Sequence, residues 1–358
     1  MHRRSLLAAL ASLGLTAVQQ PRPARRGRTV AAQDAPSGSR VETLRSIRGL
    51  PADIVGVFRD PIAYEQAASG QYFVFDRLAH TVYGVDREMQ GSWKIVQIGQ
   101  EAGRIIEPTA FALAANGTFV VADRPSAAER VQFFGPGGNL IGGFTLPGRA
   151  GETVILGSLV LNGIGSLQYD GRTLYMSQPE TGSLVAQYSP AGVPVRTFGA
   201  LRPTGHEAER DLHFALNSGL PVVNPLGGHY FVFQAGVPIF RKYDESGKLL
   251  FERHIEGVEL DPILASLPTR WPTRTAKGRE TPVVAPVVRA ARADAQGRLW
   301  VSFAAVPVTY VYDATGEKVR VVQFRGAGII SPSSLFFTGE GRLLLTPGCY
   351  EFDPAGRA

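Results

Sequence analysis

Two histidines with acidic neighbours are the residues of this sequence best suited to metal chemistry. His206 is followed by Glu207, and His213 lies two positions after Asp211. Imidazole and carboxylate groups are common protein ligands of Zn²⁺. The histidines are seven positions apart, whereas ligands on one helix face usually lie three or four apart. The pattern allows a metal site or a set of solvated polar residues on a helix, and it favours the second.

Acid–arginine pairs follow two apolar runs of the sequence. The first is Asp76-Arg77 and the second is Asp123-Arg124. Such pairs can bind a polar ligand or take part in catalysis. The same residue types also form ion pairs that connect neighbouring structural units, and this interpretation is favoured. All four residues are kept as candidates for ligand binding.

A third candidate lies in a basic stretch of the second half. Arg270, Trp271 and Arg274 place an indole among fixed positive charges. Tryptophan and arginine are enriched at binding hot spots. The alternative is that Trp271 packs on the folded domain and only holds its own segment in place.

Motifs that would define an enzyme are absent from the sequence. There is no nucleophile elbow, phosphate-binding loop, His-Glu-x-x-His or paired-cysteine motif, and Cys349 is the single cysteine. We therefore assign no catalytic residue and predict no cofactor, with a divalent metal as the alternative. No intramolecular disulfide can form.

The candidate residues are spaced along a repeat. A glycine followed by a short run of strand-forming residues occurs six times, at Gly70, Gly117, Gly171, Gly228, Gly297 and Gly341. Each run is too short for a helix and rich in β-branched and aromatic residues. In all but the first copy a second element ends in an aromatic residue and a tight turn, as in Tyr188 to Gly192. With the short runs that flank these two elements, the unit is four strands in a meander.

Six such units predict an all-β fold, a six-bladed β-propeller of four-stranded antiparallel blades spanning residues 41–358. A closed ring of blades leaves no long exposed sheet edge. The last unit has no residues left for a fourth strand, whereas Val41 to Ile47 precede the first unit and have no blade of their own. We therefore expect this N-terminal strand to close the last blade by pairing with Cys349 to Phe352.

The repeat resembles NHL repeats and the bacterial six-bladed propellers of the TolB-like superfamily. The resemblance rests on the Gly-x-Leu/Phe-x-Val strand and the aromatic-Asp-x-x-Gly hairpin, and it covers Val41 to Ala358. The Val-Ala-Asp ending of the family is kept at Val121-Ala122-Asp123 and in part at Phe75-Asp76. The resemblance implies an architecture and leaves the function open.

Three long connections mark one face of the expected propeller. Antiparallel connectivity places the blade-to-blade links and the second-to-third strand loops on one face, here called the top face. The long links span residues 146–165, 199–220 and 256–286, with short helices expected over 207–216 and 259–267. Long connections in compact domains are usually functional or disordered. We therefore expect binding around His206, His213, Arg270 and Trp271.

Two functions remain open. The first is a cell-envelope binding or scaffold propeller that presents its top face to a peptide, glycan or protein partner. The second is a metal-dependent propeller enzyme, lactonase-like or amidating-lyase-like, with a site in the central channel. The strand ends Asp76, Asp123, Ser177 and Gln234 would give such an enzyme an incomplete polar ring.

The N-terminus has the pattern of an export signal. Arg3 and Arg4 precede a mostly apolar stretch, Ser5 to Val18, which is too short to span a bilayer comfortably and suits a signal-peptide core. Both the twin-arginine and the general secretory routes fit, and an uncleaved anchor is the alternative. Residues 1–32 carry six arginines and no acid, so their removal lowers the net charge from +6 to 0. A basic nucleic-acid-binding domain is therefore not indicated.

Export predicts a processed chain in the periplasm or outside the cell. N-terminal sequencing of protein recovered from the exported fraction should find a start between about Val18 and Asp34, judged by the usual offsets of signal cleavage. An intact Met1 on exported protein would contradict this expectation.

Overall fold

The computed structural model describes residues 41–126, 128–146, 154–156, 159–161, 166–276 and 278–356. The expected signal segment, residues 1–32, lies outside the described residues. Within the described ranges, no helix is both long and apolar enough to cross a membrane.

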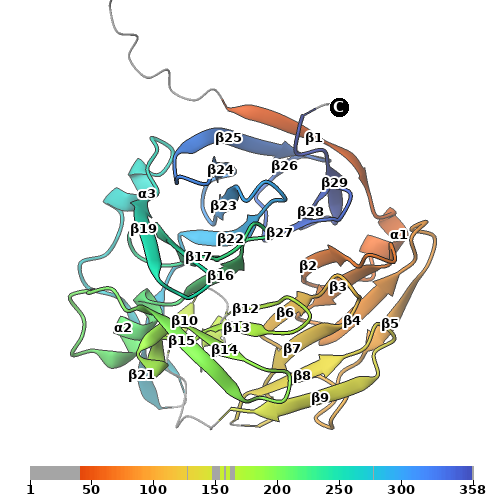
Figure 1. The fold of residues 1–358 in the computed structure, drawn as a ribbon, viewed down its shortest axis with the longest axis horizontal. Coiled ribbons are helices and arrows are strands. Elements are labelled where there is room, and N and C mark those ends of the chain that lie inside the picture. The colour runs from red at the N-terminus through yellow and green to blue at the C-terminus, as the bar shows by residue number, and fades with distance from the viewer. Residues whose placement is uncertain are drawn as a thin grey trace, which may run out of the picture. The chain divides into compact units, whose positions relative to one another are not determined.

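Four antiparallel sheets of four strands follow one another along the chain, and each is a simple meander (Figure 1). They are β2 (Pro61–Gln66) to β3 (Tyr72–Asp76), β4 (Thr81–Val85) and β5 (Ser92–Val96); β6 (Ala110–Leu113), β7 (Phe119–Asp123), β8 (Arg130–Phe134) and β9 (Leu140–Thr145); β12 (Leu167–Tyr169), β13 (Leu174–Ser177), β14 (Ser183–Tyr188) and β15 (Pro194–Ala200); and β16 (Gly219–Val223), β17 (His229–Phe233), β18 (Ile239–Tyr243) and β19 (Leu249–His254). The first strand of each sheet lies near the centre of the view in Figure 1. This is a propeller-like arrangement.

A nine-stranded sheet completes the arrangement. Its members are β22 (Val288–Ala293), β23 (Leu299–Phe303), β24 (Thr309–Tyr312), β25 (Lys318–Arg325), β1 (Glu42–Gly49), β29 (Tyr350–Phe352), β28 (Leu343–Thr346) and β27 (Ser334–Phe337) in spatial order, with β26 (Ile329–Ile330) paired to β25. The expectation of six separate, equal blades therefore differs from the structure, because the last two meanders share one sheet.

Strand β1 causes this merger. Its second half pairs antiparallel with β29, from Ser46 opposite Phe352 to Gly49 opposite Tyr350. The sequence predicted this partner, but for Val41 to Ile47, most of which does not contact β29. Its first half pairs parallel with β25, with Glu42 opposite Val322, which the sequence analysis did not anticipate. Arg320 on β25 also donates two hydrogen bonds to Glu42, at 2.9 and 2.8 Å. An eight-residue strand is long enough to cover two sheet edges at once.

Burial explains why the second strand of a sheet reads as a continuous apolar run. Strands β3, β7, β17 and β23 are buried along their whole length because neighbouring sheets cover both of their faces. The fourth strand β19 is largely exposed. Phe119 packs between Phe73 of the preceding sheet and Phe134 of its own, with ring centroids 5.6 and 5.1 Å away. Stacked aromatic residues thus hold successive sheets together.

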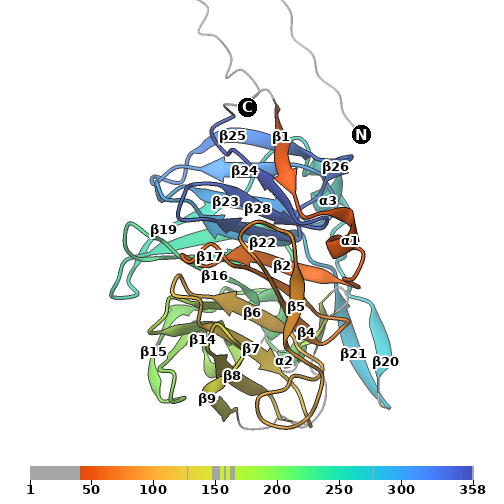
Figure 2. The same cartoon turned by 90° about the vertical axis from the view of Figure 1, so that its right-hand side faces the viewer.

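The long links carry small elements on one side of the sheets. In Figure 2, α1 (Ala52–Val55), α3 (Asp261–Ala265) and the hairpin of β20 (Thr273–Ala276) and β21 (Arg279–Val284) lie on the same side. The helix α2 (Arg210–Leu216) and the helix α3 are shorter than the expected helices over 207–216 and 259–267. The hairpin was not expected; β21 also pairs in parallel with β10 (Val154–Leu156), which continues to β11 (Leu159–Leu161). Backbone pairing therefore joins the first and third insertions.

The closing strand should dominate stability. Leu44 is 3% exposed and belongs to the core cluster that contains Phe324 and Phe352, whereas Ile47 on the same strand is 38% exposed. We expect Leu44→Ala to lower the free energy of unfolding by about 2–4 kcal/mol, as for other large-to-small core changes, and Ile47→Ala by less than about 1 kcal/mol. Equilibrium denaturation of both variants measures the difference. Equal losses would show that β1 does not contribute to the core.

Candidate functional site

The first acid–arginine pair holds a link in place. The Asp76 carboxylate accepts hydrogen bonds from the backbone amides of Arg59 (2.6 Å), Asp60 (3.1 Å) and Ala79 (2.9 Å). Arg77 donates two hydrogen bonds to Asp60, at 2.9 and 2.7 Å. Both side chains therefore fasten the segment before β2 to the end of β3, and the carboxylate oxygens already serve the backbone.

The second pair repeats this arrangement one sheet further on. Asp123 accepts the amide of Ile106 at 3.0 Å and a double hydrogen bond from Arg130 at 2.9 and 2.6 Å. Arg124 donates to Glu107 at 3.1 and 2.9 Å. The Asp123–Arg130 ion pair joins β7 to β8 within one sheet, and Arg124–Glu107 joins this sheet to its preceding link. These are ion pairs, as the favoured interpretation expected, but they do not connect neighbouring units.

The ring of strand ends does not fit a bound metal. The oxygens of Asp76 and Asp123 are engaged as described, and the Ser177 hydroxyl accepts the amide of Gly219 at 3.1 Å. Over the described ranges, no group of three or more His, Cys, Asp or Glu side chains is placed to hold a metal ion.

The second and third insertions enclose a cavity of 410 Å³, here called the insertion cavity. Its lining includes Arg202, His206, His254, Leu267 and Trp271. His206 and Trp271 were predicted from the sequence, and the structure brings them to one place. His254 was not among the predicted site residues; it is exposed at the end of β19 and lines this cavity.

Arg202 fixes the wall of the insertion cavity. Its guanidinium donates to the carbonyl groups of Leu216 (2.9 Å), Ala235 (2.6 Å) and Val237 (2.8 Å) and lies 4.2 Å from the ring centre of Phe233. Burial lowers the pKa of Arg202 to about 10, and the nearby charge of Arg241 acts in the same direction. The group remains a cation at neutral pH and joins α2 to the end of β17.

One threonine contacts both of the predicted histidines. The Thr204 hydroxyl is 2.7 Å from Nδ1 of His213, and it accepts the backbone amide of His206 at 3.2 Å. Nδ1 of His206 is 2.9 Å from a carboxylate oxygen of Glu209. His213 therefore supports the loop, and His206 is the one of the two that lines the cavity.

Trp271 packs on the folded domain and also borders the insertion cavity, so its position fits the structural role and leaves the binding role a prediction. It packs against the cluster of Leu212, Leu216 and Val284, and it also lines the insertion cavity. Arg270 and Arg274 are exposed and lie outside the cavity lining. The expected basic frame around the indole is thus not part of this cavity.

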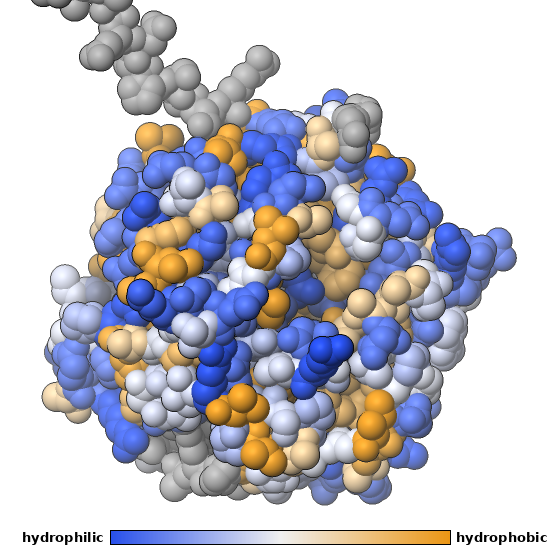
Figure 3. Space-filling model, viewed as in Figure 1, coloured by the Kyte–Doolittle hydropathy of each residue, from blue (hydrophilic) through white to orange (hydrophobic). Residues whose placement is uncertain are grey.

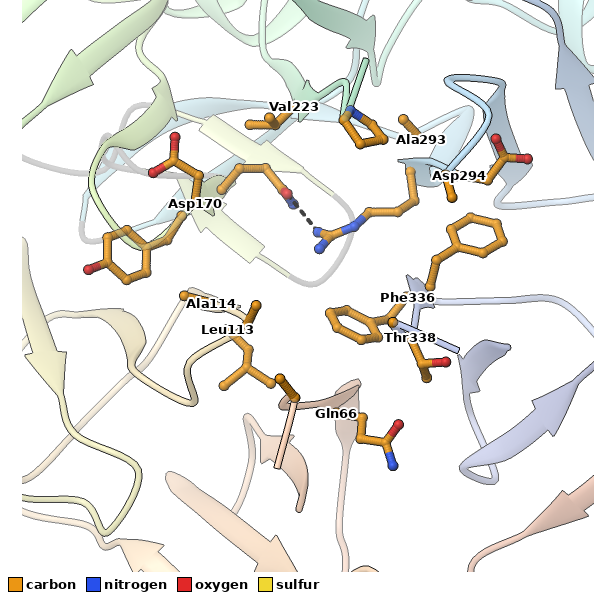
Figure 4. A pocket seen from close by; sticks show the side chains of 18 residues that line it. Gln66, Leu113, Ala114, Asp170, Val223, Ala293, Asp294, Phe336 and Thr338 are labelled. Atoms are coloured by element: carbon orange, nitrogen blue, oxygen red, sulfur yellow. Dashed lines mark hydrogen bonds between the residues drawn. The ribbon is translucent and has the colours of Figure 1, made fainter. Parts of the chain in front are cut away.

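A second polar group, missed in the sequence, lies on the central axis. It consists of Glu65 on β2, Gln168 on β12 and Arg292 on β22, and we call it the axial group. Arg292 donates a 2.6 Å hydrogen bond to Gln168 (Figure 4). Glu65 is buried and accepts the backbone amide of Leu113 on β6 at 3.0 Å. First strands are sheet edges with unpaired amides, and Glu65 satisfies one of them.

Burial raises the pKa of Glu65 to about 7, against the opposing effects of the Arg292 charge and the Leu113 amide. The carboxyl group therefore changes its charge near neutral pH. A perturbed acid beside an arginine in a channel is a common feature of functional sites.

Two cavities share Gln168 and Arg292. The smaller, 150 Å³, is lined by Thr109, Ser166 and Ser333, which precede first strands and so lie toward the top face. The larger, 380 Å³, is lined by the turns that follow the first strands, among them Ala115, Asp170 and Gly339. We call the second the turn-face cavity. Figure 3 shows hydrophilic and hydrophobic side chains around a hollow near the middle of one face.

Sequence reasoning could have located the axial group. The strand before each repeat glycine is the first strand of its unit and lies nearest the axis, and an ionisable side chain there has no neighbouring strand on its axial side. Glu65 and Arg292 both occupy such strands. The sequence did not indicate that these side chains meet across the axis, because the three members lie more than a hundred positions apart.

Comparison with known proteins adds the fold context. No known family and no curated protein matches this chain. Among solved structures it is similar to a virginiamycin B lyase from Staphylococcus aureus (10% identity, 80% of this chain and 77% of that chain, TM-score 0.47). It is also similar to a gluconolactonase from Xanthomonas campestris (15%, 88% and 95%, 0.47) and to the calcium-binding protein regucalcin from Agrobacterium tumefaciens (12%, 88% and 95%, 0.48). Similarity at these sequence identities and TM-scores does not indicate an activity. The resemblance to NHL repeats stays a prediction.

Glu65 should make stability depend on pH. Its pKa in the folded chain lies above the ordinary 4.5, so the folded state holds the proton more tightly. The stabilisation is complete below about pH 4.5 and is lost as pH rises through about 7, a change of about 3 kcal/mol. Glu65→Gln keeps an acceptor for the Leu113 amide and should remove this loss, so that it is more stable than the parent at pH 8 and similar at pH 5.

Denaturation of both proteins between pH 5 and pH 8 measures the effect. The exposed Glu101→Gln, with 75% of its side chain accessible, serves as the control and should follow the parent at every pH. A Glu65→Gln protein that loses the same stability as the parent on going to pH 8 would exclude the assigned titration.

Proposed function

We propose that this chain is an exported, six-bladed propeller of the cell envelope that binds a peptide, glycan or protein partner on its top face. The six-blade interpretation divides the nine-stranded sheet into β22–β25 and the unit of β27, β28, β29 and β1. The observation that carries the binding function is the insertion cavity, which combines an indole, two imidazoles and a fixed arginine.

The chemistry of the insertion cavity supports a ligand with a flat ring. Its 410 Å³ volume lies in the range of small-molecule sites. Trp271 offers an apolar plate, while His206 and His254 offer hydrogen-bond donors and acceptors beside it. A sugar ring or an aromatic peptide side chain matches this set. The Arg202 hydrogen bonds hold the wall before any ligand arrives, which lowers the entropic cost of binding.

A metal-dependent hydrolase or lyase is the second candidate, and the observed donor geometry disfavours it. The acids at the strand ends already accept hydrogen bonds from backbone amides and from arginine, so a metal would have to displace those hydrogen bonds. Elemental analysis of the purified protein should find less than one equivalent of any divalent metal. A metal bound in stoichiometric amount after dialysis would overturn the assignment in favour of the enzyme.

Trp271 should separate binding from stability. The probes are a glycan array and a displayed peptide library, each screened with the parent. For ligands so selected, Trp271→Ala should lower affinity by about 30-fold or more, as expected of a hot spot of at least 2 kcal/mol. Trp271→Phe keeps a ring on the α2 cluster and should retain most stability and part of the affinity.

The matched control is Val258→Ala, because Val258 lies in the same insertion and is 79% exposed. It should change neither affinity nor melting temperature. Unchanged binding by Trp271→Ala, with a lowered melting temperature, would mean that the indole only supports the fold and would contradict the proposed site.

A further inference from the structure

The turn-face cavity lies on the opposite side of the axial group from the top face. The structure contains six turns that join a first strand to a second strand, and each contributes to its lining. The cavity therefore opens at the central axis and does not lie between two neighbouring sheets. Its volume of 380 Å³ is sufficient for a molecule of modest size.

The acids of the turn-face cavity are engaged by their own turns. Asp170 accepts the backbone amides of Arg172 and Thr173 at 2.8 and 2.7 Å, and the Tyr175 hydroxyl at 3.2 Å. Asp294 accepts side-chain donors from Arg298 at 2.7 Å and Trp300 at 2.9 Å. Backbone amides of Gln296 and Arg298 donate to the same carboxylate, at 3.0 and 2.9 Å. These carboxylates are structural parts of the wall.

Arg292 is the charged group of this cavity with donors to spare. Its Nη1 donates to Gln168, and the Cζ atom of the guanidinium lies over the Phe336 ring, 5.1 Å from the ring centre. Considering only the residues that the structure describes, it forms no ion pair, and the edge made by Nε and Nη2 has no hydrogen-bond partner. Such an edge presents two parallel N–H groups, which match the two oxygens of one carboxylate.

Apolar side chains line the same cavity as this donor edge. They are Leu113, Val223, Pro225 and Phe336, and they come from three different sheets around the axis. Figure 4 shows Leu113, Val223 and Phe336 around the hydrogen bond of Gln168 and Arg292. A ligand held by its charged end at Arg292 would thus place an apolar body against these walls.

We propose that the turn-face cavity binds a small monocarboxylate with an apolar body, with its carboxylate on Arg292. This site is distinct from the insertion cavity and does not depend on the proposed function. A phosphate dianion fits less well, because a single guanidinium shares the cavity with Asp170 and Asp294. The engaged acids repel a second negative charge, whereas a single carboxylate can be matched by one arginine.

Calorimetric titration of the purified protein with benzoate and hexanoate tests the proposal, with benzamide as the neutral analogue. At least one carboxylate should bind, and benzamide should bind about 10-fold or more weakly than benzoate, since it lacks the charge. Arg292→Met should lower carboxylate affinity by about 10- to 100-fold, the loss expected for hydrogen bonds to a charged group. Arg292→Lys keeps the charge without the paired donors and should fall between.

The matched control is Arg289→Met on the same strand. Arg289 is exposed and lines only the smaller axial cavity, so its loss should leave carboxylate binding unchanged. Phe336→Leu is a second variant, for the case that Arg292→Met does not fold. It keeps an apolar wall, and it should weaken the binding of benzoate more than the binding of hexanoate. No binding of either carboxylate by the parent, or equal losses in the Arg289 and Arg292 variants, would overturn the proposal.

Discussion

The pairing of β1 with two sheet edges is the constraint on which the rest of the structure depends. A series of sheets arranged about an axis closes only if its last member joins its first. Here the joining strand comes from the start of the described domain, between β25 and β29. The single cysteine is buried and cannot form a disulfide within the chain. Closure therefore rests on backbone pairing, the core around Leu44 and the Arg320–Glu42 ion pair.

Closure also determines where polar chemistry can occur. The first strands of the units face one another across the axis, and their outward backbone groups have no neighbouring strand. Side chains from other sheets meet this need: Glu65 accepts the amide of Leu113, and Ser166 donates to the carbonyl of Gly219 at 2.5 Å. The axis is consequently a channel in which buried polar groups are required for stability. Burial at this position raises the pKa of Glu65, against the opposing effect of the positive charge of Arg292.

Much of the fold could be predicted from the sequence because its signal is local. The repeat glycines and the aromatic turns each depend on a few consecutive residues, and counting these local units was enough to find the partner of the N-terminal strand. Gly138 illustrates why: its φ is +86°, and a Cβ there would lie 2.3 Å from the carbonyl oxygen of Ile95 in the preceding sheet. What could not be predicted was non-local pairing, such as the parallel contact of β1 with β25 and the contact of β10 with β21.

The candidate sites also differ in whether a local sequence signal marks them. Trp271 and His206 were accessible to sequence reasoning because an unusual insertion marks them, although it also included Arg270 and Arg274, which lie outside the cavity. Arg292 carried no such mark, because its strand resembles the other first strands. The register of β22 shifts between Val288 and Ala290, opposite β23. A bulge of this kind redirects neighbouring side chains. Arg289 lines only the smaller axial cavity, whereas Arg292, three positions further on, lines both. The chemistry of the axis is thus set by strand register, a property of the closed arrangement that no short stretch of sequence specifies.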